Sequence, residues 1–178
     1  MRSSKFFRVP LLLLLLLGSA AVPAHAETSQ TVWYGGYLSM RTAGAFVARD
    51  ATEWAKMWRS LLESPPPRAL PDGHVGIALT MGPRRTGGYF LEMTGHEQRP
   101  CVDVVTVIEH APQPGAIVTQ AFTTPWMIAL VPAGTRPIVV ERQLAGGEKV
   151  LTVPPSEGPL LAQMGEACAN LVRPKKAP

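Results

Sequence analysis

Apolar residues recur along this chain in short runs that are separated by glycine- and proline-rich turns. The run Val75–Met81 is followed by the polar turn Arg84–Tyr89 and then by Phe90–Met93, and longer runs occupy Val102–Glu109 and Trp126–Val131. Apolar runs of about four to eight residues between turn residues are typical of β-strands. The pattern predicts further strands or extended segments at Val32–Leu38, Ala45–Ala48, Ile117–Thr124, Ile138–Glu141 and Val150–Val153, and a polar loop at Gly95–Pro100.

One stretch has helical periodicity instead. Asp50 can cap a helix, and Glu53 stands three residues later, where a capping box places it. The apolar positions that follow fall on one helical face: Trp54, Met57, Trp58, Leu61 and Leu62. The prolines at 65–67 end the helix. A second, short helix near the C-terminus is predicted from the same spacing at Leu160, Leu161, Met164, Cys168 and Leu171.

These elements predict an α+β fold. Strands that are joined by short turns favour antiparallel pairing. A helix with one apolar face can cover a sheet. We therefore predict an antiparallel β-sheet or open barrel packed on one main α-helix (about Ala51–Glu63), with a short C-terminal helix.

The N-terminus has the features of a cleaved signal peptide. Arg2, Lys5 and Arg8 precede the apolar run Leu11–Leu17, and Ala24–Ala26 forms an A-x-A cleavage site. The run is shorter than the roughly 20 residues of a transmembrane helix. We expect residues 1–26 to be removed, residues 27–178 to form a single domain, and the protein to be periplasmic or secreted, with no membrane association after cleavage.

Charge and cysteine content narrow the function classes further. The whole chain carries +4, but the predicted signal peptide holds three of its basic residues and no acidic one, so a nucleic-acid partner is not expected. Cys101 and Cys168 are the two cysteines. Export favours a disulfide between them, and the alternative is two separate buried thiols. No metal-ligand spacing is present, and we predict neither a metal nor a cofactor.

Catalytic signatures are absent from the sequence. His74, His96 and His110 stand in no metalloprotease pattern, and no serine lies in G-x-S-x-G. Three solvated histidines are the expected interpretation. An enzyme whose active site is scattered along the chain would leave no local motif, so that alternative stays open.

The polar turn is the candidate binding site, formed by Arg84, Arg85, Thr86, Gly87, Gly88 and Tyr89. Consecutive glycines allow a positive φ, which a hairpin between two strands requires. We expect the Tyr89 ring to pack inward and both arginines to be exposed. Two guanidinium groups beside a tyrosine can bind a peptide or a carboxylate, while the alternative is a structural turn with solvated arginines.

Three motifs resemble the C-terminal domain of the protease complex subunit PrcB family. Trp54 and Trp58 match its W-x-x-x-W helix, and Gly82–Tyr89 matches G-x-R-x-T-G-G-Y. Residues 112–125 match P-x-P-G-x-x-V-T-Q-x-x-T-x-P. The resemblance covers about residues 45–140. The chain departs from the family at Pro71–Gly73, where members often have V-D-F, and after Leu144.

The resemblance implies an exported, non-enzymatic accessory protein. The family's namesake associates with an exported serine protease and stabilises it, and no catalytic residues are associated with the domain. The expected partner of this chain is therefore a protein, and an exported serine protease is the candidate. The alternatives are a protease inhibitor that acts through the Thr86–Tyr89 turn, or an enzyme with no local motif.

Overall fold

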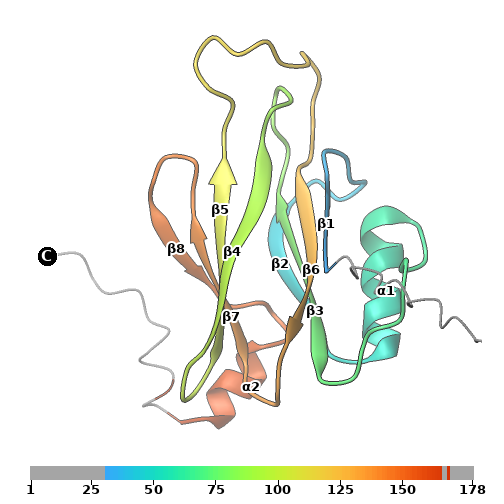
Figure 1. Cartoon of the computed structure of the whole chain (residues 1–178), viewed down its shortest axis with the longest axis vertical. Coiled ribbons are helices and arrows are strands. Elements are labelled where there is room, and N and C mark those ends of the chain that lie inside the picture. Colours follow the sequence, from blue (N-terminus) through green and yellow to red (C-terminus); the bar gives the residue numbers. More distant parts are fainter. Residues whose placement is uncertain (1–30, 166–167, 169–178) are drawn as a thin grey trace, which may run out of the picture.

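The computed structural model of the chain describes residues 31–165 and Cys168, and within this part the strands form two four-stranded β-sheets (Figure 1). The first sheet has the order β1-β6-β3-β2. Its strands are β1 (Val32–Gly35), β2 (Ala43–Ala48), β3 (His74–Met81) and β6 (Trp126–Pro132). The predicted signal peptide and Leu171 lie outside the described residues.

The second sheet has the order β4-β5-β7-β8. Its strands are β4 (Phe90–Gln98), β5 (Asp103–His110), β7 (Ile138–Gln143) and β8 (Lys149–Thr152). The pairing of β5 with β7 is parallel, with Asp103 opposite Ile138, whereas the other strand pairs of both sheets are antiparallel. The chain leaves β5, crosses to the first sheet as β6 and returns as β7.

The main core lies between the two sheets. Alternate residues of β3 face inward, and β5 and β7 contribute in the same way from the opposite sheet. Fully buried members are Ile77, Leu79, Val105, Val107, Met127, Val131, Ile138 and Val140. Because side chains on a strand alternate between its faces, the apolar runs of the central strands supply both this core and the outer layers.

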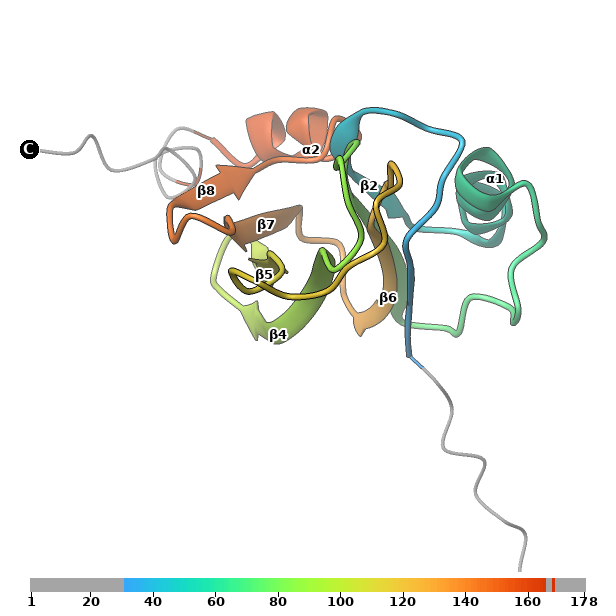
Figure 2. The ribbon, with the colours of Figure 1, turned by 90° about the horizontal axis from the view of Figure 1, so that it is seen from above.

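Helix α1 (Ala51–Leu62) covers the outer face of the first sheet, on the side away from the second (Figure 2). The side chain of Asp50 accepts a hydrogen bond from the backbone N–H of Glu53 at 2.8 Å, which caps the first turn. Trp54 and Trp58 pack edge to face, with ring centroids 5.5 Å apart. Trp54 lies directly over Gly76 of β3, where a Cβ atom would be 2.3 Å from the indole ring.

The predicted α+β class is wrong. The chain is mostly β-sheet, and its two described helices span 12 and 6 residues. The predicted helix exists, but it covers one outer face, and the second sheet covers the inner one. Periodicity within a strand shows that a face is buried and does not show what buries it, so one sheet on a helix and two facing sheets give the same local pattern.

One segment prediction also needs correction. β4 continues through Gly95 to Gln98 with a bulge between Met93 and Gly95, where the sequence predicts a polar loop. A strand whose side chains are largely exposed has no apolar alternation to reveal it. The segment 117–124, which was expected to be extended, belongs to the connection between β5 and β6 and makes an isolated antiparallel bridge between Thr123 and Arg84.

The end of the molecule opposite the long β5–β6 connection is closed by polar contacts and a disulfide. Cys101, just before β5, is bonded to Cys168 with Cα atoms 5.6 Å apart, which agrees with the pairing favoured from the sequence. Helix α2 (Gly158–Gln163) packs Leu161 against the outer face of the second sheet. The buried carboxylate of Glu157 binds Arg49 and accepts a hydrogen bond from the backbone N–H of Ile138 at 2.7 Å. Along residues 31–165 no helix is long and apolar enough to cross a membrane.

Candidate functional site

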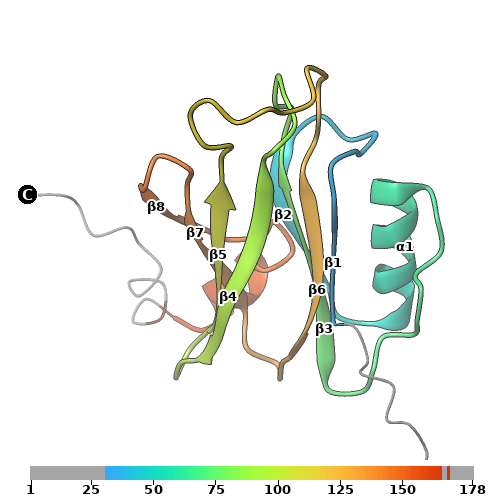
Figure 3. The same ribbon diagram turned by 45° about the horizontal axis from the view of Figure 1, so that its top comes forward.

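Three loops meet at the other end of the molecule, at the top of Figure 3. They are the β1–β2 loop (residues 36–42), the β3–β4 loop (82–89) and the β5–β6 loop (111–125). Antiparallel pairing brings them together, because Gly35 at the end of β1 and Thr80 near the end of β3 both lie opposite Trp126 at the start of β6. The predicted binding turn is therefore one part of a larger surface.

The β3–β4 loop is not a hairpin, because β3 and β4 belong to different sheets. It runs beside the β5–β6 loop and pairs with it through the backbone. Arg84 N–H donates to Thr123 O at 2.8 Å, and Thr123 N–H donates back to Arg84 O at 2.9 Å. Gly87 N–H donates to Thr119 O at 2.8 Å, and the Thr123 hydroxyl donates to Thr86 O at 2.9 Å. Two segments about 35 residues apart in the sequence thus form one paired unit.

Gly88 is a position in this unit that requires glycine. Its φ is +83°, in the left-handed region, as predicted for one of the two glycines. A Cβ atom there would stand 2.9 Å from both Pro112 Cβ and Val118 Cγ1. The glycine therefore allows the two loops to approach each other closely.

A buried ion cluster lies beneath the loops. Glu109 ends the inward-facing stripe of β5, and its side chain is 4% exposed. The carboxylate is paired with the guanidinium of Arg142 on β7 and lies 3.6 Å from Arg84 Nη2. Arg142 Nη2 also lies 3.5 Å from the carbonyl of Thr80 on β3, so the cluster spans both sheets.

Arg84 consequently differs from its prediction. Its side chain was predicted to be exposed, but it is only 30% exposed and lies within ion-pair distance of the buried Glu109 carboxylate. The Arg84 guanidinium also lies over the Tyr89 ring at 5.6 Å from its centroid. Tyr89 packs against the inter-sheet core, as expected of an inward ring. Arg84 and Tyr89 thus support the loop from below.

The outer surface of the loops is apolar and cationic. Tyr37 is 65% exposed, Phe122 is 74% exposed, and the Ile117 side chain is fully exposed. Arg85 is also exposed and forms no ion pair with any described residue. Tyr37 and Phe122 line one depression, and contiguous exposed apolar side chains are typical of interaction surfaces.

His74 and His110 each make one polar contact within the described residues. His74 Nδ1 lies 3.0 Å from the backbone carbonyl oxygen of Asp72. His110 Nε2 lies 2.7 Å from the carboxylate of Glu92, and the His110 ring stacks on the Phe90 ring. No group of three His, Cys, Asp or Glu residues in this part of the chain is placed to hold a metal ion. Neither histidine contact includes a nucleophile.

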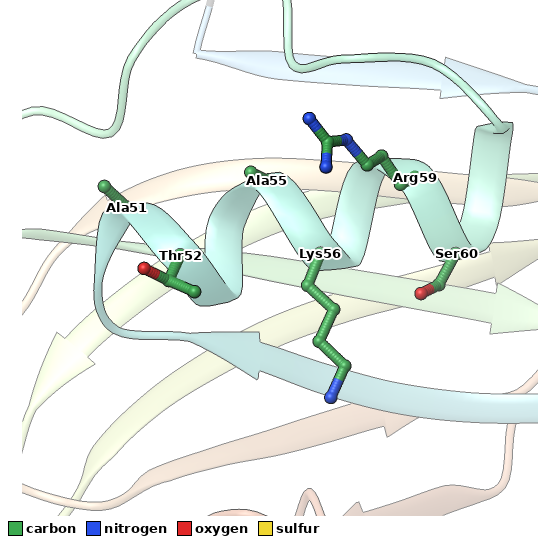
Figure 4. Close-up of a pocket in the computed structure, with 6 residues that line it drawn as sticks. All are labelled: Ala51, Thr52, Ala55, Lys56, Arg59 and Ser60. Carbon is green, nitrogen blue, oxygen red and sulfur yellow. The ribbon is translucent and has the colours of Figure 1, made fainter.

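A surface depression on the outward face of α1 carries no converging polar groups (Figure 4). Its residues are small or solvated: Ala51, Thr52, Ala55, Lys56, Arg59 and Ser60. The side chains of Lys56 and Arg59 point in different directions, so no charge is focused there.

Sequence reasoning located the turn but missed its supports. Glu109 and Arg142 each continue an inward apolar alternation, after Val107 and Val140 respectively. A charged residue in the next inward position of a strand is a usable signal for a buried ion pair. Tyr37 and Phe122 were missed because nothing local distinguishes an exposed aromatic residue from a buried one.

Comparison with known proteins supports the family resemblance. Residues 76–132 match the family model described as PrcB C-terminal, which confirms the family named from the sequence over a shorter stretch than predicted. The matched stretch runs from β3 through β6 and includes both paired loops. No curated protein and no solved structure matches the chain.

Proposed function

We propose, from the match of residues 76–132 to the PrcB C-terminal family model, that this chain is a non-enzymatic accessory subunit of a protease complex. On this proposal it is exported, binds a protease and stabilises it. The partner contacts the loop end of the molecule, where the predicted residues Arg84–Tyr89 lie.

The observation that carries the proposal is the pairing of the two loops within the matched stretch. Four hydrogen bonds fix the β3–β4 loop to the β5–β6 loop, and the Glu109 cluster anchors the first of them. Loops that are held in this way lose little conformational entropy when a partner binds, which favours affinity. The fixed loops present apolar side chains and Arg85 outward.

The inhibitor alternative receives less support from the geometry. An inhibitory loop presents extended backbone to a protease cleft, whereas Gly87 in this turn already donates its N–H to Thr119. The Thr86–Tyr89 turn lies along its neighbour and is held there. A stabilising surface contact accounts for this arrangement better than insertion into a cleft.

A capture experiment tests the proposal. The tagged chain, expressed with its own N-terminal segment in its native host, is cross-linked and purified, and the captured proteins are identified by mass spectrometry. We expect an exported protease to be enriched on the wild-type chain and lost from an Arg85→Glu, Phe122→Ser double variant. The matched control is Arg59→Glu on the exposed face of α1, which should capture the protease normally.

Stabilisation is measured separately on the captured protease. Its activity should decay more slowly on incubation when the chain is present. Enrichment of no protease over the double variant would exclude the proposal. A captured protease whose activity falls on addition of the chain would favour the inhibitor.

A further inference from the structure

A hollow of about 260 Å³ opens between the β1–β2 loop and the paired loops. Tyr37 and Arg41 line it from one side, and Pro83 and Phe122 from the other. Both aromatic rings are mostly exposed, at 65% for Tyr37 and 74% for Phe122. The hollow thus has aromatic walls and one guanidinium group.

Hydrogen bonds hold the walls in place. The hydroxyl of Thr124, which also lines the hollow, accepts a hydrogen bond from Leu38 N–H at 2.6 Å and lies 3.1 Å from Leu38 O. Thr124 N–H donates to Gly36 O at 2.7 Å. Because these contacts join the two sides through a buried threonine, the hollow is preformed.

The charge around the hollow has one sign. Residues 36–42, 82–89 and 111–125 include Arg41, Arg84 and Arg85 and no acidic residue. Arg84 is engaged with Glu109, but Arg41 and Arg85 are exposed and make no ion pair within residues 31–165. The potential at this end therefore favours an anionic partner.

We propose that the hollow takes an acidic protein segment that carries an aromatic or aliphatic residue next to its carboxylates. The apolar side chain lies between Tyr37 and Phe122, and a carboxylate pairs with Arg41. Arg85 meets a second acidic group beside the hollow. This inference rests on the proposed function and names the chemistry of the partner at the same surface.

The geometry favours a peptide over the other anionic surfaces. Recruitment to an acidic membrane typically uses about four to eight clustered basic residues, and nucleic-acid binding likewise depends on several phosphate contacts. Two free arginines beside a concave aromatic hollow match a carboxylate with an adjacent apolar side chain.

Panning a random-peptide display library on the folded, processed chain tests the inference without knowledge of the partner. We expect the enriched peptides to combine Asp or Glu with an aromatic or aliphatic residue. Fluorescence anisotropy then gives the affinity of one enriched, labelled peptide. Arg41→Gln should weaken its binding roughly five- to tenfold, as expected for a partly desolvated charge pair, and added salt should weaken it further.

Two variants and one vesicle assay complete the experiment. Phe122→Ser should weaken the same peptide, and Arg59→Gln, on the far face of α1, should leave binding unchanged. Enrichment of no peptide, enrichment of basic peptides, or full affinity in Arg41→Gln would overturn the inference. Binding to phosphatidylserine vesicles that Arg41→Gln abolishes would overturn it as well and assign the hollow to a membrane surface.

The two proposals fail separately. If acidic peptides bind as expected but no protease is captured, the hollow is a peptide site and the accessory role is wrong. If a protease is captured through the loops while Arg41→Gln binds it at full strength, the accessory role stands and this inference is wrong.

Discussion

Replacing Gly88 by alanine gives a direct test of the paired-loop architecture. The residue has a φ of +83°, and its missing Cβ would lie 2.9 Å from Pro112 Cβ and Val118 Cγ1. The substitution therefore imposes two independent costs, one in the backbone and one in the contact between the loops.

The magnitude follows from three contributions. The left-handed conformation costs a residue with a side chain about 1–2 kcal/mol. Moving Pro112 and Val118 adds about 1–2 kcal/mol, at the lower end of the cost of overpacking, because these loops are partly exposed. Alanine lowers the conformational entropy of the unfolded chain, which stabilises the folded state by about 0.4–1 kcal/mol. The expected net loss of unfolding free energy is about 1–3 kcal/mol.

Gly87→Ala is the matched control. Gly87 has no left-handed φ, and the nearest atom to its missing Cβ is Thr119 Cβ at 3.4 Å, close to ordinary contact. Its stability should change by less than about 1 kcal/mol, because neither cost applies and the unfolded-state gain remains.

Urea unfolding followed by tryptophan fluorescence measures both variants, with the disulfide kept oxidised. The loss predicted for Gly88→Ala corresponds to a fall in Tm of about 2–4 °C per kcal/mol for a chain of this size. Equal stability of Gly88→Ala and the wild type, or a larger loss in Gly87→Ala, would contradict the conformation described for the turn.

Three further substitutions probe the rest of the fold. Glu109→Gln should reduce the unfolding free energy by about 3 kcal/mol, since it leaves the largely buried guanidinium of Arg142 without a counter-charge, and a loss under 1 kcal/mol in urea titration would show that the cluster is solvated. Gly76→Ala should destabilise the chain by at least about 2 kcal/mol, because its Cβ would meet the Trp54 ring at 2.3 Å, and an unchanged fluorescence spectrum and Tm would contradict this packing. Cys101→Ala should cost about 2–4 kcal/mol through loss of the disulfide, and thermal unfolding that matches the oxidised wild type would show that the bond contributes nothing.

Local chemistry made α1 predictable. The Asp50 cap, the apolar face from Trp54 to Leu61 and the prolines after the helix all act within about four residues of the positions they control. The structure reproduces the cap, with Asp50 bonded to Glu53 N–H, and the buried face. The central strands β3, β5, β6 and β7 were predictable for the same reason, because each has its own apolar run.

The partition of strands between sheets depends on long-range pairing. β3 and β4 are consecutive in the chain, yet β3 pairs with β6 and β4 with β5. The parallel β5–β7 pair has an entire strand of the other sheet within its connection. Neither arrangement leaves a trace in the turns, because a turn constrains only the residues beside it.

The same limit applies to the candidate site. Arg84–Tyr89 were found from their composition, but their partners were not, since Arg84 and Thr123 pair through backbone atoms that every residue possesses. Arg84 was misjudged because its ion pair is made with a carboxylate 25 positions away, at the end of another strand. The apolar loop residues carry no signal of exposure in the sequence alone.

The arginines at the two ends of the molecule differ in whether they are paired with a carboxylate, and this difference bears on function. At the end that carries the disulfide, Arg49 and Arg136 are paired with the buried carboxylates of Glu157 and Asp103. At the loop end, Arg84 is satisfied by Glu109, while Arg41 and Arg85 are left without a carboxylate in the surrounding loops. An ion pair beneath an exposed apolar loop fixes the loop without covering it. The loop end can therefore keep aromatic and cationic side chains in solvent. A preformed surface for an acidic partner requires this condition.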